Sequence, residues 1–202
     1  MNTRQFVFIK SLTGILRVPV IAPTLYEEAM RIEPSIDGHF EYRPCKVESI
    51  TGEMVDRVYV VEAISYMLHW GFDPGRRQLS ILSVAHVQES PSRLPATLAN
   101  SIYKKGETSM GGTRFSIVFR DGTKAGGEVG NAVDFLDYPP GYQGKDVIDV
   151  LYDSTEGAKM FTAADYRWCL YALPPDDAAE KLRGLETHLK NTKVTWRYGD
   201  SD

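Results

Sequence analysis

Serine, histidine and aspartate side chains of the kinds that hydrolytic enzymes use are spread along this chain. Ser83 and His86 lie in one stretch, 79–88, whereas Asp121 and Asp134 come much later. A hydrolytic site could be assembled from these scattered residues, but no G-x-S-x-G turn marks a nucleophilic serine. We therefore predict no catalytic residue, and we keep a hydrolase-type enzyme as an alternative function.

A metal site is the second chemical possibility, because His39 and Glu41 could share one face of a strand and bind a metal ion with His69 or His86. The stretch HFEYRPC resembles half of the zinc-deaminase signature, in which H-x-E is followed by P-C-x-x-C. Here Cys45 is followed by Lys-Val-Glu, so the second cysteine of the signature is absent. We predict no metal site.

The stretch VLYDSTEGA leads from an apolar strand into a small polar loop, 153–157. It resembles the phosphate loop of flavodoxins, in which hydroxyls and backbone N–H groups surround the FMN phosphate. The matching residues are Ser154, Thr155 and Gly157. In flavodoxins most of the domain follows this loop, whereas too little of this chain follows Gly157. We expect a turn closed by a Ser or Thr hydroxyl and no cofactor; a phosphate or flavin binder is a further alternative.

Two glycine pairs, at 111–112 and 126–127, fit no nucleotide-binding fingerprint. Their expected role is to let a hairpin and its neighbour turn or bulge. The same pairs would also allow a peptide or a partner strand to approach the backbone closely.

Loop residues suited to protein contact are the more informative feature. The stretch DYPPGYQGK, 137–145, places Tyr138 and Tyr142 around two prolines and a glycine. Tyrosine offers a large amphipathic contact area at low entropy cost, and proline stiffens the loop that presents it. A second turn, FDPGRRQ, carries Arg76 and Arg77, which could pair with carboxylates of an acidic partner. We predict these four side chains as partner contacts.

The composition is that of a globular chain, with 202 residues, of which 43% are hydrophobic and 25% charged. The net charge of −4 disfavours general nucleic-acid binding, which needs a basic excess. No apolar stretch is long enough to span a bilayer, and the N-terminal residues do not form a secretory signal. Two cysteines make no disulfide framework, and the apolar neighbours of Cys169 predict a buried thiol. We expect a soluble cytoplasmic protein without membrane or nucleic-acid partners.

The periodicity and turn signals predict a single α+β domain over residues 1–202, with a mixed or largely antiparallel sheet and three to four helices packed on it. Strands are expected at 5–12 and 15–22, as a hairpin or two short strands, and at 113–119 and 124–130, as a hairpin that turns at Asp121-Gly122. Further strands are expected at 79–88, 146–152, 166–175 and 193–199, with a short strand from 132 and an edge strand or bulge at 39–50. Helices are expected at 22–35, at 92–107 with Gly106 at its end, and at 175–191.

The stretch 55–72 is ambiguous between strand and helix. Its β-branched start favours a strand, but its polar residues fall near one helical face. We predict a helix that Asp56 caps and Gly71 ends, with a strand in residues 55–70 as the alternative.

Residues near both ends of the chain carry signals for a helix start and for helix packing. Thr24 and Glu27 have the capping-box spacing. The C-terminal helix carries one apolar stripe, which is expected to pack on the sheet that contains the last strand. This stripe consists of Ala178, Leu182, Leu185 and Leu189.

These features together favour a non-enzymatic interaction or assembly protein that acts through loop contacts. It could be a subunit of a larger particle, or an acidic inhibitor or immunity-type binding module. Its partner would be another protein or a second copy of itself.

Overall fold

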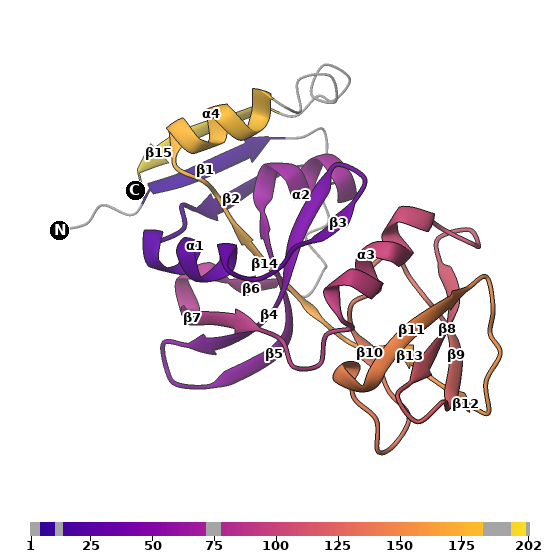
Figure 1. Ribbon diagram of the computed structural model, residues 1–202. Helices are drawn as coiled ribbons and strands as arrows, with labels where there is room; N and C mark the ends of the chain where they lie inside the picture. The colour runs from indigo at the N-terminus through magenta and orange to yellow at the C-terminus, as the bar shows by residue number, and fades with distance from the viewer. Residues whose placement is uncertain (1–4, 11–13, 72–77, 184–194, 201–202) are drawn as a thin grey trace.

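The computed structural model describes residues 5–10, 14–71, 78–183 and 195–200. Within these residues the chain forms four α-helices and several mixed or antiparallel sheets, which confirms the expected α+β class. Two lobes are visible in Figure 1: residues 96–163 build the smaller lobe, and the larger lobe contains residues from before and after this range.

The larger lobe is built on a mixed sheet. Its strands lie in the order β3 (Ser35–Asp37), β4 (Phe40–Ser49), β5 (Met54–Glu62), β14 (Arg167–Tyr171) and β6 (Gln78–Ser80), with β7 (Val84–Glu89) paired to β4. β14 runs parallel to both β5 and β6. This arrangement is possible because the chain passes through the smaller lobe before it returns as β14, and parallel neighbours need such a long connection.

The predicted N-terminal hairpin is confirmed, and the last strand joins it. β1 (Gln5–Lys10) pairs antiparallel with β2 (Ile15–Pro19) on one side and with β15 (Thr195–Asp200) on the other. α4 (Pro175–Arg183) lies beside this sheet in Figure 1. Of the predicted apolar stripe, Ala178 is buried, whereas the side chain of Leu182 and residues Leu185 and Leu189 lie outside the described part.

The smaller lobe is built around the predicted hairpin at Asp121-Gly122. Its sheet has the order β11 (Val147–Tyr152), β8 (Thr113–Phe119), β9 (Lys124–Val129) and β12 (Lys159–Met160). A second pair joins β10 (Leu136–Asp137) to β13 (Thr162–Ala163), and α3 (Ala96–Lys105) covers the side that faces the larger lobe (Figure 1).

The helix predicted over 55–72 is half wrong. β5 occupies residues up to Glu62, and α2 (Ala63–Trp70) begins only there. Val58, Val60 and Val61 are buried between β4 and β14, so pairing on both sides overrides the helical spacing of the polar residues. The cap is Glu62, whose carboxylate accepts the N–H groups of the first turn, and not Asp56; Gly71 ends the helix as predicted.

The first helix also begins differently from the prediction. α1 (Pro23–Met30) has Pro23 in its first turn, and Ala22 occupies the N-cap position without a side-chain hydrogen bond. The capping box of Thr24 and Glu27 is therefore not formed, because proline at the first helical position starts the helix one residue before Thr24.

The packing of three to four helices on one sheet is not confirmed. α2 contacts β4, β5 and β14, α1 contacts β7, and α3 contacts β3 and β11. Within the described ranges, no helix combines the length and the apolar character that a membrane-spanning helix needs.

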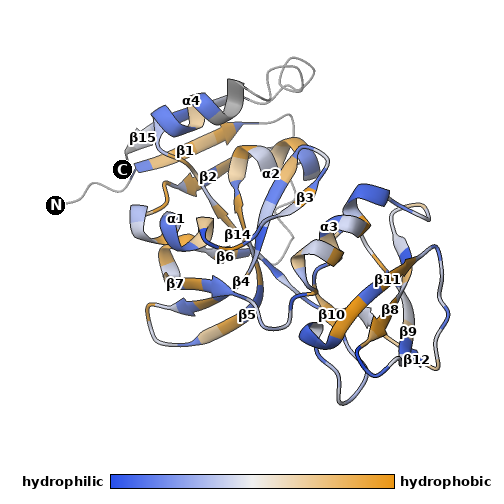
Figure 2. Cartoon of the chain, in the orientation of Figure 1, coloured by the Kyte–Doolittle hydropathy of each residue, from blue (hydrophilic) through white to orange (hydrophobic). Residues whose placement is uncertain are grey.

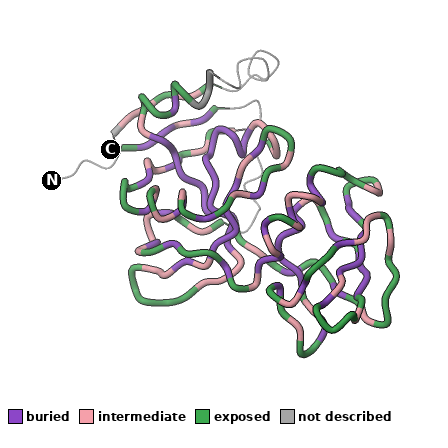
Figure 3. Tube along the Cα trace, viewed as in Figure 1, coloured by how far each residue is buried: buried purple, intermediate pink, exposed green. Residues whose placement is uncertain are grey.

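The centre of the larger lobe is aromatic. The side chain of Trp168 on β14 is 1% exposed. Its ring centroid lies 4.8 to 6.5 Å from those of Phe40, Tyr42, Tyr59, Tyr66, Trp70 and Tyr166. Hydrophobic residues concentrate on the strands of both lobes (Figure 2), and the same strands contain most of the buried residues (Figure 3).

Candidate functional site

The two tyrosines predicted as partner contacts line the same surface pocket. Its volume is about 320 Å³, and it lies where the loop after β10 approaches β5 and the segment before α3. We call it the tyrosine-loop pocket; its lining residues are Arg57, Pro91, Ser92, Asp137, Tyr138, Tyr142, Gln143 and Gly144.

Tyr138 forms the buried side of this pocket. Its hydroxyl oxygen is fully buried and has no hydrogen-bond partner among the described residues. Burial raises the pKa of Tyr138, because the charged phenolate would lose its hydration. Gly144 allows this packing, since a Cβ there would lie 2.0 Å from the Arg93 carbonyl oxygen and 3.1 Å from the Tyr138 hydroxyl.

Tyr142 attaches the loop to the β8–β9 hairpin. Its ring stacks on Phe119, with 4.0 Å between the centroids, and its hydroxyl donates to Asp121 at 2.8 Å. The hydrogen bonds from the Thr123 backbone N–H and from Tyr142 lower the pKa of the Asp121 carboxyl. Tyr142 is therefore an anchor of its own lobe as well as part of the pocket wall.

Arg57 supplies the charged side of the pocket and was not predicted from the sequence. Its Nη1 lies 2.7 Å from Asp137 Oδ1. Its backbone φ is +59°, which is uncommon for a residue other than glycine and costs conformational energy. Arg76 and Arg77, the other two predicted contacts, lie outside the described residues.

The 153–157 loop forms a turn, as expected. Ser154 Oγ accepts the N–H of Glu156 at 3.2 Å, and β12, not a helix, follows the loop. The loop packs on the glycine pair at 126–127, because a Cβ on Gly126 would lie 2.3 Å from Thr155 O. The 153–157 loop of the chain itself therefore fills the space beside this glycine pair, where a peptide or partner strand was considered.

The scattered hydrolase candidates are not brought together. Ser83 donates to the carbonyl of Ser80, and His86 bonds Glu28 on α1. Asp121 lies in the β8–β9 turn, and Asp134 is fully buried elsewhere. Each candidate has a different partner, so these residues form no Ser–His–Asp relay.

Glu28 should control the titration of His86. The Glu28 carboxylate accepts a hydrogen bond from His86 Nδ1 at 3.0 Å, and this bond raises the pKa of His86 above its ordinary value. Stability from this pair is present below the unfolded pKa of about 6.5 and is lost as the pH rises through the folded value. We expect Glu28→Gln to bring the His86 pKa down, as followed by NMR titration of the imidazole. Glu48→Gln, which removes only a weaker charge effect, should lower it less; equal shifts would contradict the assignment.

The residues considered as candidate metal ligands are only partly brought together. The rings of His39 and His69 lie 5.9 Å apart, and Glu41 pairs with Arg43 instead. His86 lies on β7, with Glu28. The described residues contain no group of three or more His, Cys, Asp or Glu side chains placed to hold a metal ion.

The two cysteines are buried and free, as predicted for Cys169. They lie on β4 and β14, on either side of β5. Burial raises the pKa of Cys169 to about 12 and also raises the pKa of Cys45, so both stay protonated thiols at neutral pH.

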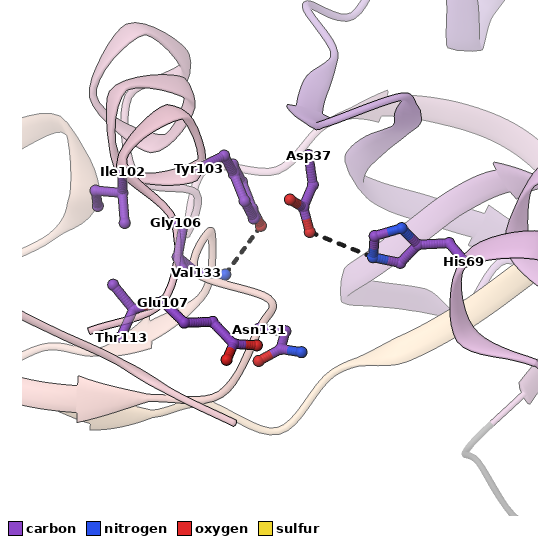
Figure 4. Close-up of a pocket in the computed structure, with 9 residues that line it drawn as sticks. All are labelled: Asp37, His69, Ile102, Tyr103, Gly106, Glu107, Thr113, Asn131 and Val133. Atoms are coloured by element: carbon purple, nitrogen blue, oxygen red, sulfur yellow. Dashed lines mark hydrogen bonds and ion pairs between the residues drawn. The ribbon is translucent and has the colours of Figure 1, made fainter. Parts of the chain in front are cut away.

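A second pocket lies between the two lobes (Figure 4). Its volume is about 220 Å³. We call it the interlobe pocket; its lining residues are Asp37, His69, Ile102, Tyr103, Gly106, Glu107, Thr113, Asn131 and Val133. In it, His69 Nε2 lies 3.3 Å from Asp37 Oδ2.

A buried ion pair joins the lobes beneath this pocket. Arg93 and Asp134 have side chains 2% and 0% exposed, with 3.5 Å between Nε and Oδ1. The Asp134 carboxylate also accepts hydrogen bonds from Ser35, Tyr59 and Tyr103. The isolated aspartate in the apolar stretch AVDFL was a sequence signal for such a buried carboxylate.

Comparison of this chain with protein-family models, with curated proteins and with solved structures finds no match. The assignment of a function therefore depends on the geometry of the two pockets.

Proposed function

We propose that this protein acts by binding a protein partner, without catalysis, and that the tyrosine-loop pocket is the contact surface. The observation that carries the proposal is that Tyr138 and Tyr142 line one pocket together with Arg57. Tyrosine and arginine are enriched in interfaces, where a few such residues dominate the binding energy. The partner is a different protein or a second copy, as suits an assembly subunit or an acidic inhibitor or immunity-type module.

The loop is held in place before any partner binds. The N–H of Gln143 donates to the Asp146 carboxylate at 2.9 Å, and the N–H of Asp146 donates to the Gln143 carbonyl at 3.0 Å. Tyr142 fixes the other side through its stacking on Phe119. A loop restrained in this way loses little conformational entropy on association, which favours affinity.

The buried Tyr138 hydroxyl supports a partner with a polar group that reaches into the pocket. A buried hydroxyl without a hydrogen bond costs free energy, and a group that completes the bond recovers it. A partner side chain with a polar end would satisfy this atom and fill the pocket at once.

Arg57→Gly is the test of this proposal. Glycine tolerates the φ of +59°, so the variant should fold and keep its melting temperature. We expect it to weaken association by about 1 kcal/mol or more, as the loss of an interface arginine does. If the partner is a second copy of the chain, size exclusion with light scattering measures the self-association. If it is a different protein captured from native lysate, the Kd is measured between the two purified proteins.

The matched control is Arg31→Ala, which removes an exposed arginine of α1 that pairs with Glu27 and lies outside the pocket. Tyr142→Ala is a poorer test, because it also removes the stacking on Phe119. If Arg57→Gly and Arg31→Ala bind with the same affinity as the wild type, the pocket is not the contact surface. A turnover that needs His39, His69 or His86 would favour the enzyme alternative.

A further inference from the structure

The interlobe pocket has its charged and polar groups on two facing walls. Asp37 of β3 and His69 of α2 come from the larger lobe. Glu107 and Asn131 come from the smaller lobe, and in Figure 4 the carboxylate of Glu107 and the amide oxygen of Asn131 point toward one another. The pocket is therefore closed by side chains of both lobes.

Hydrogen-bond acceptors dominate this lining. Asn131 Oδ1 is fully buried and has no hydrogen-bond partner within the described structure. Two carboxylates, Asp37 and Glu107, face the same space, and no lysine or arginine of the described residues lines it. The Tyr103 hydroxyl is already used, because it donates to Asp134 and accepts the N–H of Val133.

The backbone adds to the negative potential. α3 ends at Lys105 and its last turn, with Ile102, Tyr103 and the C-cap Gly106, lines the pocket. The C-terminus of a helix carries a partial negative charge, which favours a cation. Lys104 and Lys105 of the same turn carry opposing charges, but neither lines the pocket. Carboxylates, an unpartnered amide oxygen and a helix C-terminus thus point to the same kind of ligand.

We propose that the interlobe pocket binds a small free organic cation with several N–H donors, of the guanidinium or ammonium class. A cation donates to Asn131 Oδ1 and Glu107 at once, and so satisfies the buried amide oxygen. The volume of about 220 Å³ is below that of pockets for drug-sized ligands, which limits the ligand to roughly the size of an amino acid. The site is separate from the tyrosine-loop pocket and does not depend on the proposed partner binding.

The test uses agmatine as the cationic probe and glutarate as the anionic one, with the full chain and isothermal titration calorimetry. We expect saturable one-to-one binding of agmatine with a Kd of about a millimolar or below, and no binding of glutarate. Glu107→Gln should weaken agmatine binding about tenfold, since it removes a charged hydrogen-bond acceptor. Asn131→Asp should strengthen binding, because it adds a negative charge beside the cation.

Glu53→Gln is the matched control, because it makes the same change at an exposed position between β4 and β5, outside the pocket. It should leave the affinity for agmatine unchanged. The proposal is overturned if agmatine shows no saturable binding at about ten millimolar, if glutarate binds equally well, or if Glu107→Gln and Glu53→Gln behave alike. Loss of binding in Asn131→Asp would also overturn it, because Asn131 would then act as a donor to Glu107. Binding of a blocked arginine tripeptide without binding of agmatine would exclude a free ligand.

Discussion

Arg93→Met should lower the free energy of unfolding by about 3–5 kcal/mol, because it leaves Asp134 as an uncompensated buried charge. Both side chains are almost fully buried. Arg93 also donates to the Glu33 carbonyl at 2.7 Å and to the Ser35 hydroxyl at 3.1 Å, so the change removes two hydrogen bonds within the larger lobe as well as the ion pair that joins the lobes. Urea unfolding of the wild type and the variant measures the difference.

The loss of unfolding free energy in Arg93→Met should depend on pH, because it is caused by the charge of the buried Asp134 carboxylate. Complete burial raises the pKa of Asp134, and the charge of Arg93 opposes this rise. A carboxyl with a raised folded pKa contributes stability that is present below its unfolded value, near 3.9, and lost as the pH rises through the folded value. Without Arg93 that pKa rises further, so the destabilisation should shrink as the pH falls and Asp134 becomes neutral.

The double variant Arg93→Met with Asp134→Asn is the control. Asparagine carries no charge and keeps one acceptor oxygen, which can take the place of Oδ1, the acceptor of the Ser35 hydroxyl, or of Oδ2, the acceptor of the Tyr103 hydroxyl. We expect the double variant to be more stable than Arg93→Met alone, which would show that the buried charge is the main cost. A loss below about 1 kcal/mol in the single variant would mean that water reaches Asp134.

Whether a segment forms a helix or a strand follows in most cases from its local sequence pattern. Which other segments it pairs with or packs against does not. The hairpin at Asp121-Gly122 and the helix that ends at Gly106 are predicted because turn and cap residues act within a few positions. The strand part of 55–72 is missed because its conformation depends on β14, which lies more than a hundred residues later. The periodicity of residues within a short window carries no information about a parallel strand that pairs from so far along the chain.

The site is predictable to the same limited extent. Tyr138 and Tyr142, which line the tyrosine-loop pocket, stand out in the sequence because proline and tyrosine in one short loop are a local signal. Arg57 does not stand out in the sequence, because its place in the pocket lining comes from a positive φ and from Asp137, which the fold brings to it. Glu107 and Asn131 meet within the smaller lobe, and Asp37 joins them only because the two lobes come together, so each looks like an ordinary surface residue in the sequence.

Trp168→Ala should lower the free energy of unfolding by about 3–5 kcal/mol, which is the usual cost of truncating a buried tryptophan. The side chain is 1% exposed and lies between β5 and β6 on a strand that is paired on both sides. Its removal leaves a cavity among the rings of Tyr59, Tyr66 and Phe40. Edge-to-face and tilted ring contacts add to the loss, since such pairs contribute beyond their buried area.

Trp196→Ala on β15 is the matched control, because Trp196 is only partly buried and packs at the margin of the core. The control should lose much less stability, since less apolar surface leaves water at that position. Trp168→Phe should fall between the wild type and Trp168→Ala, because phenylalanine refills part of the cavity. Unfolding by urea and the near-ultraviolet circular dichroism of all three variants test this order. Equal losses for Trp168→Ala and Trp196→Ala would mean that the aromatic cluster is not the centre of the larger lobe, because the cost of truncation scales with the cavity that the surrounding side chains cannot close.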